Sequence, residues 1–212
     1  NYLNGVNMSE VNYTLYENDL PKTIEFSDCI AIDTETMGLD FRRDRLCLIQ
    51  ISNGDNHAHL VQIKKNTSYP ILTKILKNNN IMKIFHYARF DLATIQKNMG
   101  IFCENIYCTK IASKLIRTYT DKHGLKELCK ELINVDISKQ KQSSDWGNKT
   151  LSHDQLKYAA SDVLYLHKIK YELDIILERE GRKELAEKLF QFIGTRAFLD
   201  LNGWNEPDIF DH

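Results

Sequence analysis

Two carboxylates that could share a cation follow a short apolar run near residue 30. Asp33 and Glu35 come after Cys29–Ile32, whose apolar and β-branched residues are typical of a buried strand that ends at Asp33. Side chains two residues apart on a strand point to the same side, so these carboxylates would lie together and repel each other. A bound cation would relieve that repulsion. The simpler alternative is a strand that ends here and exposes two acidic side chains to water.

Two more acidic motifs follow farther along the chain. Asp91 comes after the apolar run Ile81–Phe85, in the first turn of an expected helix, where the helix dipole favours a negative charge. Tyr158 and Asp162 are four residues apart and therefore share one face of a late helix, which places a phenol beside a carboxylate. Each motif alone also fits a structural role, as a helix cap or as a core tyrosine beside a surface aspartate.

The charge of the chain is unevenly distributed. Its 212 residues carry a net charge of −1 at pH 7, which excludes nucleic-acid binding through bulk positive charge. By segment, however, residues 1–63 carry −6, residues 64–170 carry +10 and residues 171–212 carry −5. The basic middle segment could form a face for a polyanion; alternatively, its lysines could be scattered over the surface and only solubilise the protein.

The composition indicates a reducing compartment. The five cysteines include no Cys-x-x-Cys pair, which argues against a disulfide framework and against a zinc ribbon. No apolar run approaches the ~20 residues that a membrane span requires. We therefore expect a cytoplasmic protein that does not enter a membrane, and no obligate protein partner is evident.

The elements that position these residues can be predicted from the apolar pattern. Strands are expected at Cys29–Ile32, Leu46–Ile51, His57–Ile63 and Ile81–Phe85, the middle two as an antiparallel hairpin. Helices are expected at 70–77, Phe90–Met99, Lys110–Arg117, Leu125–Ile133, Ser152–Arg179 and Lys183–Leu199. This order predicts an α/β fold in which a mixed sheet carries helices on both faces. We expect one domain over residues 8–212, with a flexible leader at 1–7 and a C-terminal helix and tail at 181–212 packed on it.

The order of the motifs resembles the DEDD superfamily of 3′–5′ exonucleases, in its tyrosine-bearing branch, and ribonuclease D-like enzymes in particular. The resemblance runs through Ala31–Leu39, Arg45–Ile51, His86–Asp91, Lys139–Trp146 and Leu156–Leu166. It implies an RNase H-like three-layer fold. Larger ribonuclease D proteins continue into helical substrate-binding domains, whereas here only residues 183–212 follow the helix that carries the last motif. From this departure in length we expect a stand-alone catalytic domain.

The resemblance also implies a role for particular residues. The carboxylates of Asp33, Glu35, Asp91 and Asp162 would bind two divalent metal ions, Mg²⁺ or Mn²⁺, and Tyr158 would orient the attacking water. Substrate contacts are expected from Met37, Leu39, His86, Arg89, Lys139, Lys141 and Gln142. Met37 and Leu39 could instead close a turn against the core, His86 could make a structural hydrogen bond, and the lysines could belong to a solvated loop.

The activity implied is hydrolysis of the 3′-terminal phosphodiester of single-stranded RNA, with release of nucleoside 5′-monophosphates, in tRNA precursor processing or RNA turnover. One alternative is the same chemistry on DNA, because the distinction depends on contacts to the 2′-hydroxyl. Another is a non-catalytic RNA-binding domain, which the presence of all four carboxylates and the tyrosine disfavours.

Overall fold

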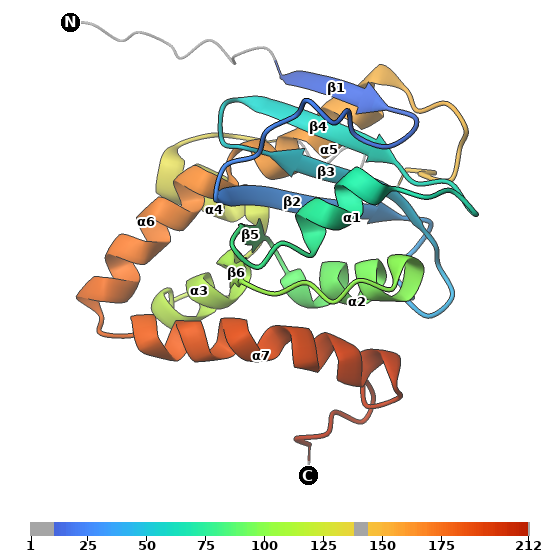
Figure 1. Cartoon of the computed structure of the whole chain (residues 1–212). Helices are drawn as coiled ribbons and strands as arrows, with labels where there is room; N and C mark the ends of the chain where they lie inside the picture. Colours follow the sequence, from blue (N-terminus) through green and yellow to red (C-terminus); the bar gives the residue numbers. More distant parts are fainter. Residues whose placement is uncertain (1–10, 138–143, 212) are drawn as a thin grey trace, which may run out of the picture.

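The computed structural model describes residues 11–137 and 144–211, and in this part of the chain a mixed sheet of six strands forms the centre of the fold (Figure 1). The strands are β1 (Asn12–Tyr16), β2 (Cys29–Thr36), β3 (Leu46–Ser52), β4 (His57–Gln62), β5 (Met82–Phe85) and β6 (Ile106–Cys108). Their order in the sheet is β1-β4-β3-β2-β5-β6. The predicted leader, residues 1–7, lies outside the described residues.

Strand β2 lies inside the sheet and pairs in both directions. It is antiparallel to β3 and parallel to β5, while β3 and β4 form the predicted antiparallel hairpin. Parallel pairs join β1 to β4 and β5 to β6. The two outer strands of the sheet, β1 and β6, were not predicted. Both are short, and their pairing partners are distant in the sequence, so local pattern alone does not reveal them.

Helices cover both faces of the sheet, as predicted, with α1 in front and α5 behind in Figure 1. Their bounds are α1 (Pro70–Leu76), α2 (Ala88–Met99), α3 (Thr109–Ile116), α4 (Leu125–Ile133), α5 (His153–Leu164), α6 (Leu166–Arg179) and α7 (Lys183–Leu201). Helix α7 runs alongside α2 (Figure 1). Within the described residues, no helix has the length and apolar character needed to cross a membrane.

The prediction of one long helix from Ser152 to Arg179 was wrong, because the chain turns at Tyr165 and continues as a second helix. Helix α5 packs on β2, β3 and β4, whereas α6 packs on α3 and α4, and one straight helix cannot follow both surfaces. The start of α5 is capped by its own side chains, because Ser152 and Gln155 form a reciprocal capping box.

The carboxylates of Asp33 and Glu35 lie inside strand β2 and not at its end. Strand β2 continues through Asp33 to Thr36, with Asp33 opposite Gln50 and Glu35 opposite Leu48 of β3. The apolar run that was visible in the sequence is therefore only the first half of the strand. Backbone pairing on β3 continues past Asp33 and fixes both carboxylates in the sheet, so a water-exposed strand end does not account for them.

Candidate active site

A cavity of about 610 Å³ opens where the second half of β2 meets α2, α4 and α5. It brings together all four acidic residues singled out in the sequence and the tyrosine, which come from β2, α2 and α5. Its lining includes Asp33, Glu35, Asp91, Tyr158 and Asp162. Residues up to 129 positions apart in the chain thus meet at one place, which is difficult to explain by separate capping or surface roles.

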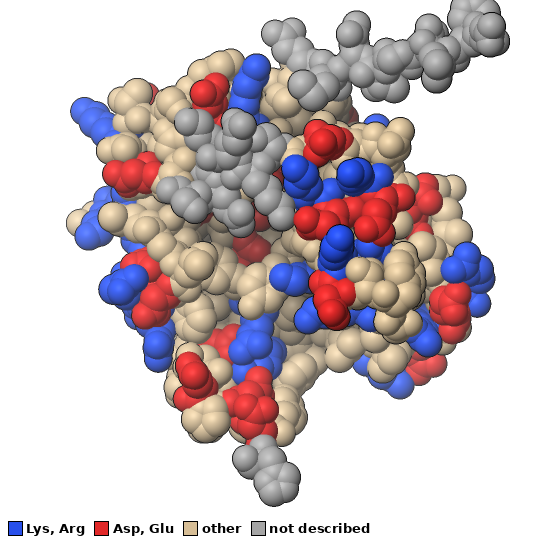
Figure 2. Space-filling model, turned by 180° about the vertical axis from the view of Figure 1, so that it is seen from behind, with Lys and Arg blue, Asp and Glu red and all other residues tan. Residues whose placement is uncertain are grey.

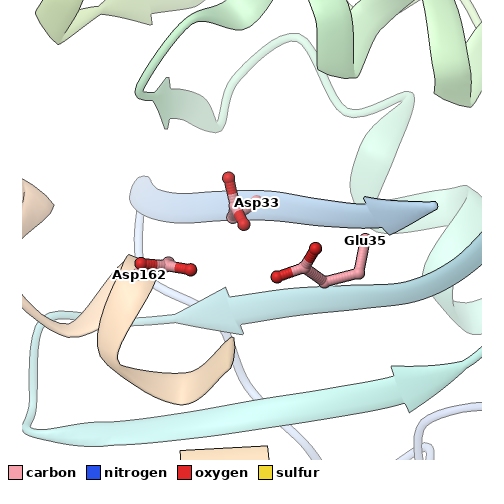
Figure 3. A group of neighbouring side chains, drawn as sticks. All are labelled: Asp33, Glu35 and Asp162. Atoms are coloured by element: carbon pink, nitrogen blue, oxygen red, sulfur yellow. The ribbon is translucent and has the colours of Figure 1, made fainter. Parts of the chain in front are cut away.

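Three of the carboxylates are close enough to share one cation. Asp33 and Glu35 from β2 and Asp162 from α5 offer oxygen atoms that all lie within 4.8 Å of one another, and Figure 3 shows their side chains converging between strand and helix. Asp91 lies outside this group of three but lines the same cavity. The geometry therefore provides a three-carboxylate position with a fourth carboxylate nearby.

Burial and mutual repulsion make the ionised form of these acids costly. Burial is the main cause that raises the pKa of Asp33, Glu35, Asp91 and Asp162, and the negative charge of Asp33 raises the pKa of the other three further. Within the described residues, no lysine or arginine forms an ion pair with any of these four carboxylates. An all-oxygen set with excess negative charge and no basic partner fits a hard divalent cation such as Mg²⁺ or Mn²⁺.

Tyr158 is held beside the acids by the helix repeat. It lies one turn before Asp162 on α5, and its ring packs near that of Trp146, with 6.2 Å between ring centroids. Burial, followed by the charge of Asp162, raises the pKa of the phenol. The hydroxyl therefore stays protonated at neutral pH and can donate a hydrogen bond within the cavity. The buried Trp146 also lines the cavity and was not assigned a role from the sequence.

Two apolar side chains stand in solvent at the mouth of the cavity. Met37 is 57% exposed and Leu39 is 88% exposed, and both line the cavity. Such exposure rules out the alternative in which they close the turn against the core. Their position leaves apolar surface available for a ligand, as expected for residues that contact a base or a ribose.

Of the five polar residues expected near substrate phosphates, one lines the cavity, one does not, and three lie outside the described residues. His86 lines the cavity, and its Nδ1 also shares a hydrogen bond of 2.9 Å with Thr109 Oγ1. The structure does not bring Arg89 to the cavity, because its guanidinium makes two hydrogen bonds, of 2.6 and 2.8 Å, to Asp200 of α7. Three of the predicted contacts fall outside the described residues, namely Lys139, Lys141 and Gln142.

Two lysines that sequence reasoning did not select line the cavity instead. Lys110 of α3 lies 4.4 Å from the centre of the Tyr87 ring, and Lys126 of α4 lies 3.5 Å from Asp136. Both belong to the basic segment 64–170, the only signal in the sequence that pointed to them. On the face shown in Figure 2, however, basic and acidic side chains are interspersed and do not form one basic surface. Individual lysines are therefore better candidates for phosphate contacts than a bulk charge.

Comparison with known proteins agrees with this geometry. A model of a 3′–5′ exonuclease family matches residues 13–178. Two structures of Brucella melitensis NrnC are similar to this chain. The one bound to pGG has a TM-score of 0.92 and 53% identity, over 96% of this chain and 100% of that chain. The one with bound Mg²⁺ has a TM-score of 0.90 and 53% identity, over 95% and 99%. These likenesses confirm the predicted RNase H-like exonuclease fold.

Curated proteins show the same relationship over part of their length. DNA polymerase I of Aquifex aeolicus is 30% identical over 86% of this chain and 33% of its own length. Ribonuclease D of Jannaschia sp. is 28% identical over 85% of this chain and 51% of its own length. The chain thus spans about a third to a half of these two relatives. On the family match, the fold and the acidic cavity together, the chain belongs to the 3′–5′ exonuclease family, as a hydrolytic exonuclease of the ribonuclease D and NrnC type.

Proposed function

We propose that this protein is a two-metal-ion 3′–5′ exoribonuclease that removes nucleoside 5′-monophosphates from single-stranded RNA. The observation that carries the proposal is the acidic cavity, in which Asp33, Glu35 and Asp162 lie within 4.8 Å of one another with Asp91 beside them. Brucella melitensis NrnC, about half identical in sequence, has been solved with Mg²⁺ and with pGG, which supports both the cation and a short oligonucleotide as ligands of this chain.

Each part of the cavity has a role in this reaction. The four carboxylates hold the cations, and Asp33 is the one whose charge affects all of the others. Bound divalent cations would lower the pKa of the attacking water and stabilise the charge of the leaving oxygen. The protonated phenol of Tyr158 orients that water by hydrogen bonding. Exposed Met37 and Leu39 contact the terminal base and ribose without reading the base.

Two observations support RNA as the substrate, and one supports the alternative of DNA. The Lys139–Trp146 segment resembles ribonuclease D, and the pGG-bound NrnC structure is the basis for proposing a short guanine-containing oligonucleotide and a role in RNA turnover. In contrast, the similarity to DNA polymerase I of Aquifex aeolicus supports a 3′–5′ exodeoxyribonuclease. The stand-alone character of the domain and a role in tRNA precursor processing stay predictions.

The cysteines support a reducing compartment. Cys47, Cys103, Cys108 and Cys129 are buried thiols, Cys29 is partly buried, and none forms a disulfide within the described residues. Disulfide-free buried thiols are usual in the cytoplasm. We therefore propose a cytoplasmic enzyme.

The proposal can be tested by comparing RNA and DNA of the same sequence as substrates with Mg²⁺, Mn²⁺ or EDTA. The D33N and D162N variants keep the side-chain volume but remove the charge. We therefore expect each to lose about 10²–10³-fold in rate, the scale of lost electrostatic stabilisation, while the metal-free fold is retained. The matched control is D55N, in the turn that joins β3 and β4, away from the cavity. Undiminished RNA cleavage by D162N would refute the assignment, and faster cleavage of DNA than of RNA would favour the alternative.

A further inference from the structure

Two uncharged side chains hold two of the acidic residues in place. Thr34 stands between Asp33 and Glu35 in β2, and its Oγ1 donates to Asp91 Oδ1 at 2.6 Å. Gln50 lies opposite Asp33 in the antiparallel register of β2 and β3, and its Nε2 donates to Asp33 Oδ2 at 3.2 Å. Thr34 is 7% exposed and Gln50 is fully buried. Each bond restricts the rotation of one carboxylate and so selects the direction in which its oxygens point.

The chemistry of these donors suits a cation site. A lysine or arginine in the same place would neutralise the carboxylate and compete with a cation, whereas a hydroxyl or an amide orients the carboxylate and leaves its charge intact. The Thr34 bond also joins β2 to α2 across 57 residues, which fixes the position of Asp91 relative to Asp33. Strand alternation directs Asp33 and Thr34 to opposite sides of β2, so one short segment both supplies a carboxylate and orients another.

Gln50 is not explained by the needs of the fold. It is the one polar side chain in the otherwise apolar run Leu46–Ile51, and its Oε1 is buried without a hydrogen-bond partner in the described part of the chain. A leucine there would avoid the cost of burying an unpaired amide oxygen. The bond to Asp33 is the one favourable use of the side chain that the described residues show.

We propose that Thr34 and Gln50 are positioning residues that orient Asp91 and Asp33 for divalent-cation binding. This inference rests on the proposed function, because it assigns these residues to the cations of that reaction. Partners that orient metal-binding groups contribute about 10–100-fold to metal affinity. Loss of either donor should therefore weaken cation binding by about that factor, even in the absence of nucleic acid.

Calorimetric titration of the substrate-free protein with Mn²⁺ tests the inference. The informative variants are T34V and Q50L, which keep the side-chain volume and remove the hydrogen-bond donor. T34S is the conservative variant, because it keeps the hydroxyl. Matched controls are T94V and Q62L. Thr94 is fully buried in α2 with its Oγ1 unpartnered among the described residues, and Gln62 is buried in β4 and bonds to the carbonyls of Asn148 and Lys149. Circular dichroism and Tm without metal confirm that each variant folds.

We expect T34V and Q50L to raise the Mn²⁺ dissociation constant about 10–100-fold, T34S to bind within about threefold of the unaltered protein, and both controls to bind normally. At saturating Mn²⁺, KM for RNA should be unchanged in all variants. Normal Mn²⁺ binding by T34V and Q50L would overturn the inference, as would equal weakening in T94V and Q62L or a failure of T34S to restore binding. Absence of Mn²⁺ binding by the unaltered protein would instead overturn the proposed function.

Discussion

Replacing Asp200 with alanine tests the role that the structure gives to Arg89. The Asp200 carboxylate is 2% exposed and pairs with Arg89 of α2 at 2.6 Å and with Arg196 of its own helix at 3.1 Å. It thereby joins α7 to the helix that carries Asp91 (Figure 1). In the D200A variant both guanidinium groups lose this acceptor, although Arg196 keeps its pair with Asp208 at 2.6 Å.

The magnitude follows from burial. Removing one partner of a buried ion pair costs about 3–5 kcal/mol. Because the Arg89 side chain is 34% exposed, solvent screens the pair and we expect a cost below that range, about 2–3 kcal/mol. For a chain of this size, 1 kcal/mol corresponds to about 2–4 °C in Tm, so D200A should lower Tm by roughly 4–12 °C. R89A should cost less, about 1 kcal/mol, because Asp200 keeps Arg196 as a partner.

The assay combines thermal unfolding with steady-state kinetics well below Tm. If Arg89 only ties α2 to α7, R89A and D200A lose stability while KM for RNA stays within about twofold. The matched control is R179A, since Arg179 pairs with Glu180 at the surface and its loss should cost less than about 0.5 kcal/mol. A large rise in KM for R89A with unchanged Tm would contradict this reasoning and restore the phosphate contact expected from the sequence.

Three further predictions follow from the site and from the helix that carries it. Burial raises the pKa values of the cavity carboxyls, to about 7 for Asp33, so the folded metal-free protein binds more protons than the unfolded chain above pH ~4. Its stability should therefore fall as pH rises from ~5 to 8. D162N, or Mn²⁺ added to the unaltered protein, should reduce this dependence of Tm on pH, and an unchanged dependence would contradict the raised pKa values. L39A should raise KM for RNA several-fold with Tm unchanged, because the Leu39 side chain is 88% exposed and contributes little to the core. The control Y171A, at a tyrosine of α6 that is 66% exposed and does not line the cavity, should leave KM unaltered. Equal KM values for both variants would show that Leu39 does not contact substrate. S152A removes the cap of α5 and should lower Tm by roughly 2–4 °C, or about 1 kcal/mol, while S161A on the same helix should cost less; no loss in S152A would refute the capping role.

The sequence is most informative where chemistry and periodicity coincide. The spacing of Asp33 and Glu35 places both on one side of a strand, and the spacing of Tyr158 and Asp162 places both on one helix face, so each local pair could be predicted. Their convergence could not, because it depends on how α5 packs across β2, β3 and β4. The resemblance to a family supplied that step by giving the order of the motifs.

Partners that are distant in the sequence account for what sequence reasoning did not foresee. Arg89 looks like a phosphate ligand because it sits in the motif with Asp91, but its partner Asp200 lies 111 residues away. No proline or glycine in the sequence marks the turn at Tyr165. The turn arises because α5 and α6 pack on different surfaces. Gln50 and Thr34 were not selected, since a lone polar residue in a strand carries no spacing signal until its register with Asp33 and its contact with Asp91 are known.

The central claim is that the acidic cavity performs metal-dependent hydrolysis from the 3′ end, and product identity tests it most directly. RNA labelled separately at each end, digested with Mn²⁺ and analysed by mass spectrometry, should release nucleoside 5′-monophosphates from the 3′ end only, and EDTA should abolish the release. Internal cleavage, products with a 3′-phosphate, or an equal rate in EDTA would contradict the account.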